Sequence, residues 1–555
     1  MFHSKPTTIM IHRIYILLLS AILFVGCQSD LLDTQPYDNL GESQFWITEK
    51  HALMGVNAIY NNLTQDMVYG QYFMLDCLSP YAYGYDFFEA EMTSSTTPYS
   101  ATYSGKWSQL YLGVQRANDA LDRIPAMSSL SDAMKNRLIG EAKFLRALHY
   151  FNLMDFFGAV PIYETPVVYS EAMKPRNTVE EVSAFIKKDL TEAIELLPVS
   201  YASADFGRAT KGAAIALRGK TALYIQDFEN AENDFKTVMT MTYDLHPNYA
   251  ELFKAKTENN KEIIFSIQNI ATAGFGESMS FRLGTRATRG SCWTNGIPSP
   301  TLVDMYENID GSPFNWDKVI PGFSSMTADQ KSVLFSEKSN VEKAYQNRDP
   351  RLQTSVIVPW AEYVGASNVT YKLAWPFKSA ASPTFHIQHN WNANAIYVWR
   401  KFVAVGDESL LREAGPIDFP VIRFADVLLM FAEARNRRIA APDAEVFSAI
   451  NKVRTRAGLP ALQNTSAAAP TYSATKADMT KRIIQERAVE LAAEGVSYSD
   501  VRRWKIAEQV NNGPILEFTG KTLKTRVFQP RDYLWPIPQS EIDQNKAIVQ
   551  NVGWQ

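Results

Sequence analysis

The sequence predicts a mainly α-helical protein with about four helix hairpins, and three observations support this fold class. Apolar residues recur at helical spacing in five segments: 141–163, 208–239, 419–437, 442–460 and 480–505. Glycine and proline lie where helix ends require them. The stretches 64–104 and 243–420 are richer in Gly, Pro, Ser, Tyr and Trp, as is typical of short strands and long loops.

The segment 141–163 is the first long helix of this pattern. Phe144, Leu148 and Phe151 lie on one face, and polar residues occupy another. Gly158 and Pro161 predict the end of the helix, because neither residue continues a helix easily.

The segment 208–239 predicts two helices joined by a tight turn at Gln226-Asp227. Small residues line the first helix and bulky residues stripe the second: Ala213, Ala216, Gly219 and Ala222, then Phe228, Phe235 and Val238. Small residues facing bulky ones let two helices pack closely. The pattern resembles a tetratricopeptide unit, with Ala231 and Phe235 at its small and aromatic positions.

The remaining hairpins are predicted near the C-terminus. The segment 419–437 leads into 442–460, which begins with Pro442 and ends with Gly458 and Pro460, as helix termini prefer. The segment 480–505 predicts another helix pair.

The N-terminus has the pattern of an export signal. Lys5 and Arg13 precede the apolar run 14–25, which is too short to cross a bilayer but suits a secretory signal. The residues before Cys27 resemble a bacterial lipobox, in which the chain is cut before the cysteine and the thiol is acylated. We therefore expect residues 1–26 to be a lipoprotein signal peptide and Cys27 to be the site of lipid attachment.

Cysteine usage and charge exclude some classes of protein. Cys77 and Cys292 are too few for a disulfide framework, and either one bridge or two free thiols fits the sequence. The net charge is −4 and no basic run is present, so nucleic acid is not an expected partner.

Candidate catalytic and metal-binding patterns are weak. Glu486, Glu490 and Glu494 lie one helical turn apart, so they cannot easily flank a glycosidic bond, and we expect them to pair with Arg482, Arg487, Arg502 or Arg503. His386 and His389 lack nearby Cys or acidic ligands. We expect no enzyme activity and no cofactor; nothing in the sequence supports a structural calcium ion.

Two aromatic loops are the candidate ligand-binding sites. One carries Tyr81, Tyr83, Tyr85 and Asp86, and the other carries Trp293 and Asn295. Aromatic rings stack on the apolar faces of sugars, while carboxylates and amides bind sugar hydroxyls, so this combination is expected of a carbohydrate site. Trp316 and Trp391 also lie in polar stretches. For any one of these residues, packing in the core is an equally good interpretation.

A series of motifs resembles the SusD/RagB family of nutrient-binding lipoproteins of the Bacteroidota outer membrane. In order, these motifs are "LLDTQP" after Cys27, "EAKFLRALHYFNLMDFFGAVP", "NRDPRL", "FPVIRFADVLLMFAEARN", "INKVRTRAGLP", "ERAVELAAEG" and "YLWPIPQSEIDQNKAIVQNVGW". The series covers nearly the whole chain after Cys27. One departure is Val496-Ser497-Tyr498, where the family often has an arginine.

The resemblance implies four tetratricopeptide-like helix hairpins packed against an irregular subdomain. It implies a surface lipoprotein, not an enzyme, that passes oligosaccharides, or peptides in the RagB branch, to a SusC-like TonB-dependent transporter. We expect residues 27–300 to form an N-terminal part with the aromatic ligand loops, and residues 301–555 to form the C-terminal SusD/RagB part.

Overall fold

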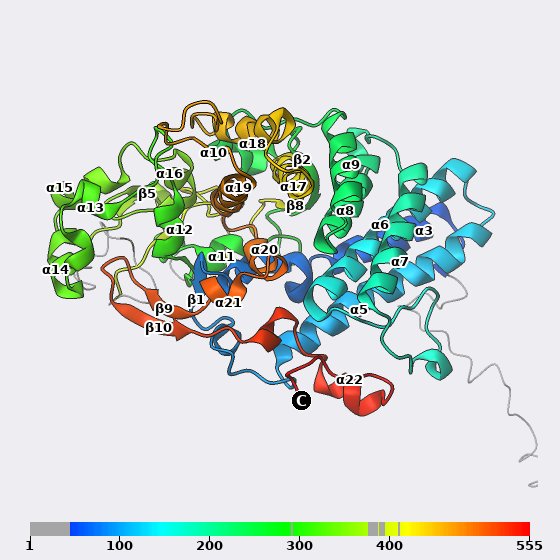
Figure 1. Ribbon diagram of the computed structural model, residues 1–555. Coiled ribbons are helices and arrows are strands. Elements are labelled where there is room, and N and C mark those ends of the chain that lie inside the picture. The colour runs from blue at the N-terminus through cyan, green and yellow to red at the C-terminus, as the bar shows by residue number, and fades with distance from the viewer. Residues whose placement is uncertain (1–44, 290–291, 376–386, 388–393, 409–410) are drawn as a thin grey trace, which may run out of the picture.

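The computed structural model describes residues 45–289, 292–375, 387, 394–408 and 411–555. The lipid-attachment candidate Cys27, as well as His386, His389 and Trp391, lies outside the described residues. The fold is mainly helical, which confirms the predicted fold class (Figure 1). None of the helices in the described ranges combines the length and apolarity that a bilayer crossing needs.

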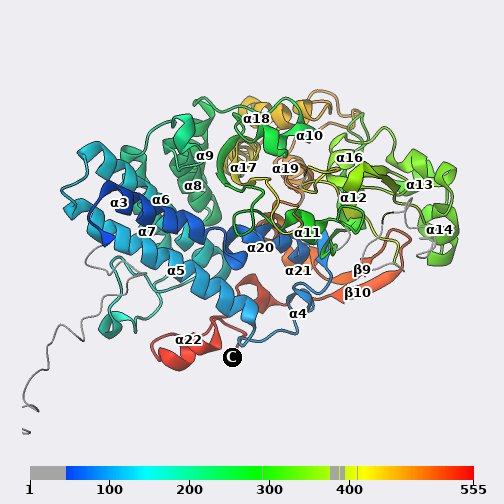
Figure 2. The same cartoon turned by 180° about the vertical axis from the view of Figure 1, so that it is seen from behind.

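Long helices gather on one side of the molecule and in its centre, and shorter helices and strands occupy the other side (Figures 1 and 2). The long helices are α3 (Glu49–Asn62), α5 (Ala101–Arg123), α6 (Asp132–Phe157), α7 (Val179–Leu196), α8 (Lys211–Tyr224), α9 (Phe228–Met239), α17 (Phe424–Arg438), α18 (Ala444–Arg456) and α19 (Lys476–Glu490). Helices α5 to α9 pack in sequence order, and α17 then packs against α9, α18 and α19.

The irregular side and the connections carry short helices. They are α4 (Glu89–Met92), α10 (Tyr249–Leu252), α11 (Met279–Leu283), α12 (Pro300–Met305), α13 (Trp316–Val319), α14 (Ala328–Phe335), α15 (Lys338–Val341), α16 (Arg351–Ser355), α20 (Ser497–Arg503), α21 (Ala507–Val510) and α22 (Gln539–Gln544). Because none of these exceeds eight residues, this part depends on packing rather than on helix propensity.

The strands form two-stranded antiparallel sheets. Some sheets join segments that are distant in the sequence, and others join consecutive strands. The pairs are β1 (Ala82–Gly84) with β3 (Gly296–Pro298), β2 (Ile263–Ile267) with β8 (Phe419–Arg423), β4 (Val356–Ile357) with β7 (Val398–Trp399), β5 (Glu362–Val364) with β6 (Thr370–Lys372), and β9 (Gly513–Leu516) with β10 (Thr522–Arg526). The predicted helix over 419–437 is therefore wrong in its first residues, because the apolar run from Phe419 pairs with β2 before α17 begins.

The predicted turn between α8 and α9 is confirmed. Gln226 adopts a positive φ of 63°, and the Asp227 side chain accepts from the Asn230 N–H to begin α9. A side chain at Gly219 would lie 2.9 Å from the ring of Phe235, so glycine on α8 permits the close approach of α9. The small-against-bulky pattern thus describes a real helix interface.

A buried histidine fixes the contact between α5 and α6. The His149 ring has Leu145 O at 2.7 Å from Nδ1 and Asn62 Nδ2 at 3.0 Å from Nε2. Burial lowers the pKa of His149 to about 4, so the ring is neutral at physiological pH. The ring fills the space beside Gly113, where a Cβ atom would lie 2.1 Å from Nε2.

We expect Gly113→Ala to destabilise the fold by about 1–3 kcal/mol, because the anchored His149 ring cannot move aside without breaking its hydrogen bonds. Chemical denaturation would measure the change. Gly105→Ala on the same helix is the control, since its Cβ would lie 3.4 Å from the nearest atom, and alanine is the better helix former. Equal stabilities for the two variants would contradict this account of the interface.

A buried ionic network joins the helical side to the irregular side. Glu490 on α19 lies within 2.7–2.8 Å of Arg423 and Arg351 and also contacts Arg456. Glu486 binds Arg351 and Arg454, and Glu494 binds Lys401 and Arg423. All these side chains are no more than 5 % exposed. The three glutamates are therefore ion-pair partners inside the protein, as the sequence indicated.

The partners predicted for these glutamates were wrong. Arg487 binds Asp426 and Asp500, Arg502 binds Asp155, Arg503 binds Glu433 and Asp500, and Arg482 binds Glu307. The error has a geometric reason. Sequence reasoning paired residues of the same segment, whereas the fold brings arginines from β8, α16 and α18 to α19.

Candidate functional site

The two aromatic loops singled out in the sequence lie side by side. Strands β1 and β3 pair antiparallel with Tyr83 opposite Ile297. Beyond the strands, the Tyr85 N–H donates to Asn295 O at 2.7 Å, and the Asn295 amide donates to Tyr85 O at 3.2 Å. Loops more than two hundred residues apart in the sequence thus form one unit.

Burial separates the six candidate residues into two groups. Tyr81, Tyr83 and Asn295 are buried, and Tyr83 is only 1 % exposed. Their rings and amide pack inside the protein, so the structure does not contain the expected platform of three tyrosines. The reason is tertiary packing, because β1 is buried along its whole length, pairs along one edge with β3 and packs against the short 3-10 helix Tyr72–Leu78.

The other three candidates reach the surface. Trp293 is 42 % exposed, Tyr85 is half-buried and Asp86 is exposed. The role of these residues in ligand binding stays a prediction. Trp316, in contrast, stacks on Phe323 at 4.2 Å and donates its indole N–H to Asp304, which is core packing.

Trp293 lies against helix α11, which carries two residues that sequence reasoning missed. The Trp293 ring lies 5.1 Å from the ring of Phe281, and the backbone N–H of Trp293 donates to Phe281 O at 2.9 Å. The guanidinium of Arg282 lies 4.8 Å from the Phe281 ring and 5.7 Å from the Phe87 ring. Aromatic residues in a polar, glycine-containing stretch were the signal that marked Trp293, and the same signal is present around Phe281.

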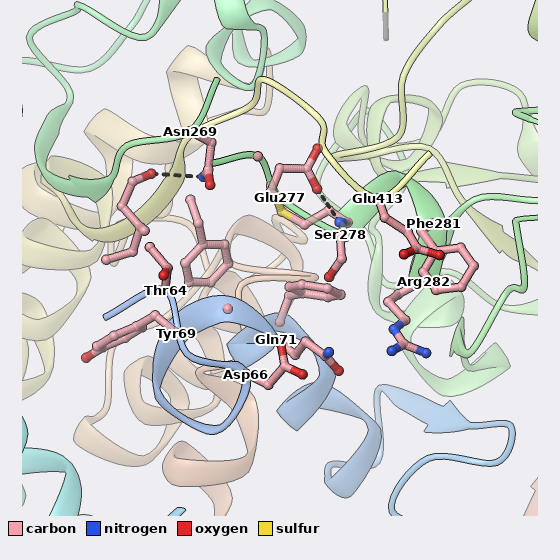
Figure 3. A pocket seen from close by; sticks show the side chains of 16 residues that line it. Thr64, Asp66, Tyr69, Gln71, Asn269, Glu277, Ser278, Phe281, Arg282 and Glu413 are labelled. Atoms are coloured by element: carbon pink, nitrogen blue, oxygen red, sulfur yellow. Dashed lines mark hydrogen bonds between the residues drawn. The ribbon is translucent and has the colours of Figure 1, made fainter. Parts of the chain in front are cut away.

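Phe281 and Arg282 also line a cleft of about 270 Å³ (Figure 3). Its other walls come from the turn after α3 and from the segment after β2. The lining side chains labelled in the figure are Thr64, Asp66, Tyr69, Gln71, Asn269, Glu277, Ser278 and Glu413. The cleft therefore combines aromatic rings, amides, hydroxyls and charges, as ligand sites with a few oriented polar groups do.

The turn after α3 holds its residues in place through tight backbone packing. A side chain at Gly70 would lie 2.3 Å from Thr64 O, so only glycine fits there. The Tyr69 hydroxyl accepts from the Asn152 amide of α6 at 3.0 Å, and the Tyr69 ring lies 4.8 Å from Tyr72. The wall formed by this turn is thus supported by the long helices.

The opposite wall is anchored by Asn269 and Glu277. The Asn269 N–H donates to Asp418 at 2.8 Å, and its amide donates to Ile267 O and Ile417 O at 3.1 Å. The Glu277 backbone pairs with Gly415, while its carboxyl group accepts from the Met279 N–H at the start of α11. These bonds fix the direction in which α11 presents Phe281 and Arg282.

Burial shifts the pKa of two groups in this cleft. It raises the pKa of Glu277 to about 8, so this carboxyl group is largely protonated at neutral pH, and one of its oxygens has no hydrogen-bond partner among the described residues. Burial also lowers the pKa of Arg282, which the negative charge of Asp66 opposes. The positive charge of Arg282 is retained because its ordinary pKa lies far above neutrality.

We expect the raised pKa of Glu277 to make stability fall as the pH rises from about 4.5 to about 8. In this window the folded state keeps a proton that the unfolded state has lost. Urea unfolding at both ends of the window would measure the slope. Glu277→Gln should reduce the slope of unfolding free energy against pH by the equivalent of up to one proton. Part of the slope should remain, because the pKa values of Asp418 and Glu258 are raised as well. An unchanged slope would contradict this assignment.

Metal chemistry has no support in this site. In the ranges that the structure describes, no cluster of three or more His, Cys, Asp or Glu side chains is arranged to hold a metal ion.

Cys77 and Cys292 are both buried and free. Of the two arrangements that fit the sequence, one bridge or two free thiols, the structure has the two free thiols.

The fold is mainly helical, and its irregular side carries short helices and two-stranded sheets. Residues 261–554 match the model of the SusD family, and residues 30–223 match a family described as starch-binding and associating with the outer membrane. The chain therefore belongs to the SusD family.

Relatives and solved structures agree with this assignment. The chain is 25 % identical to a SusD-like protein of Formosa agariphila, over 97 % of this chain and 98 % of that protein. It is 25 % identical to the starch-binding protein SusD of Bacteroides thetaiotaomicron, over 81 % of this chain and 78 % of that protein. The structure of a SusD-like carbohydrate-binding protein of Bacteroides fragilis superposes with a TM-score of 0.77 at 26 % identity. The match covers 91 % of this chain and 99 % of that chain.

Proposed function

We propose that this protein captures oligosaccharides at the cell surface and delivers them to a SusC-like TonB-dependent transporter. The single observation that carries the proposal is the exposed Trp293 beside a cleft with amide, hydroxyl and charged side chains. The relatives named for starch or carbohydrate binding support the same class of ligand. The matched family that is described as associating with the outer membrane supports the location.

Capture combines two kinds of contact. The Trp293 ring offers an apolar face to a sugar ring, while Arg282, Asp66 and the side-chain oxygen of Asn269 offer charges and an acceptor to hydroxyl groups. Tyr85 and Asp86 extend this surface beside Trp293. In our proposal an acyl chain on Cys27 keeps the protein at the outer membrane, so the captured ligand stays near the transporter.

A binding role is favoured over an enzymatic one by the location of the carboxylates. The aligned glutamates Glu486, Glu490 and Glu494 are buried in ion pairs, so no substrate reaches them. A reducing-end assay on mixed polysaccharides is expected to detect no release by the pure protein. Release that disappeared with Glu490→Gln in a folded variant would contradict the binding role.

Peptide capture is the alternative within the same family, and calorimetry separates the two. We expect heat of binding with an oligosaccharide selected on a glycan array and none with a mixture of short peptides. Binding of peptides but not of any glycan on the array would overturn the proposal. Mass spectrometry of the native protein tests the anchor, since it should find Cys27 acylated at the mature N-terminus.

A further inference from the structure

A second pocket of about 450 Å³ adjoins the cleft beside Trp293. Both are lined by Thr64, Ile267, Asn269, Gly276 and Glu413, so the two spaces are neighbours that share part of their walls. The second pocket lies between the end of α3, the loop 204–208 and the segment 266–276. Its volume falls in the range of ~300–1,000 Å³ that is usual for ligand pockets.

Polar side chains line this pocket on the α3 side. Asn57 and Asn61 on α3 and Gln268 after β2 are exposed, so they can reach a ligand. Arg208 is held in place, because it donates to Asn57 Oδ1 at 3.0 Å and to Glu141 Oε2 at 2.8 Å. Amides and a fixed guanidinium are suited to binding hydroxyl groups.

Two exposed phenylalanines line the same pocket. Phe275 is 64 % exposed and Phe206 is 39 % exposed, and the neighbouring Ile270 is exposed as well. Exposed apolar side chains that gather around a pocket commonly mark a binding site. Phe275 lines the second pocket directly, whereas Trp293 is placed next to the first cleft through its contact with the lining residue Phe281.

The backbone holds Phe275 outward. Its N–H donates to Thr272 O and its carbonyl accepts from the Ile270 N–H, both at 2.9 Å, which closes a tight loop. Gly276 then passes close to the backbone, since a Cβ there would lie 2.6 Å from Ala414 Cα. A loop closed in this way presents the ring at a small cost in conformational entropy on binding.

We infer that the pocket at Phe206 and Phe275 is a second carbohydrate subsite, next to the cleft at Trp293, so that the ligand is an oligosaccharide long enough to occupy both. This inference rests on the proposed function. One sugar unit stacks beside Trp293, the chain passes Asn269 and Thr64, and a distant unit stacks on Phe275. Amides and charges along the path bind the hydroxyl groups between the two aromatic ends.

The test uses graded fragments of the polysaccharide that the wild-type protein binds most tightly on a glycan array. We expect Phe275→Ala to weaken binding of long fragments roughly tenfold and to leave the shortest bound fragment unchanged. Trp293→Ala should weaken the long and the short fragments alike. Tyr99→Ala is the matched control, because Tyr99 is an aromatic residue, 77 % exposed, outside the lining of both pockets, whereas Trp293 packs on the lining residue Phe281.

The outcomes separate the two claims. If Trp293→Ala weakens binding but Phe275→Ala has no effect at any fragment length, the second subsite is wrong and the proposed function stands. If no glycan on the array binds to the wild-type protein, the proposed function fails and the subsite fails with it. Binding of an apolar peptide, but of no glycan, at the pocket lined by Phe275 would identify this pocket as a protein-binding surface. This result would also overturn the inference.

Discussion

Glu490→Gln is expected to lower the free energy of unfolding by about 3–5 kcal/mol. Glu490 is fully buried and faces the guanidinium groups of Arg351, Arg423 and Arg456. Burial alone would raise the pKa of Glu490, but the three arginines hold it well below its ordinary value. Loss of this one negative charge leaves three buried arginines with one carboxylate partner fewer, which is far more costly than the loss of a surface ion pair.

Denaturant unfolding measures this effect, and Glu445→Gln is the control. Glu445 lies in the first turn of α18 and pairs with Lys236 and Arg435 near the surface, and its own side chain is 42 % exposed. This control should change stability by less than about 1 kcal/mol. If the two variants lost similar amounts of stability, the buried network would not be what joins the helical side to the irregular side.

Trp293→Ala is expected to weaken oligosaccharide binding at least tenfold, or about 1.4 kcal/mol, and to leave stability nearly unchanged. The ring is partly exposed and rests on Phe281, so its removal takes away contact area for a ligand without opening the core. Calorimetry with the glycan selected on the array measures the affinity.

Two controls make this result specific. Tyr99→Ala removes an exposed ring that is not part of the cleft lining and should leave the affinity unchanged. Trp293→Phe keeps an aromatic face and should restore most of the binding. If the wild-type protein and Trp293→Ala bound the glycan with equal affinity, this ring would be excluded as a ligand platform.

Much of the helical side could be predicted from the sequence. The 3.6-residue spacing of apolar residues located α6, α8, α9, α17, α18 and α19, and Gly158 and Gly458 marked where α6 and α18 end. These features are local, so a single sequence contains them. The strand β8 was missed because Phe419–Arg423 is apolar and directly precedes a helix. Only its pairing with β2 decides that it is extended.

The candidate site was harder to predict, for a physical reason. Composition marked the loops of Tyr81 and Trp293, but it could not tell that the segments packed around β1 bury Tyr81 and Tyr83. Burial depends on what packs against a residue, and these partners are distant in sequence. Phe275 and Arg282 were missed because short loops and a five-residue helix carry no periodic signal.

The crystal structure of the protein soaked with the selected oligosaccharide tests the central claim most directly. Our account predicts sugar rings stacked on Trp293, polar contacts with Arg282 and Asn269 in the cleft, and a chain that continues toward Phe275. A glycan bound at another face of the molecule, with the Trp293 cleft empty, would contradict it.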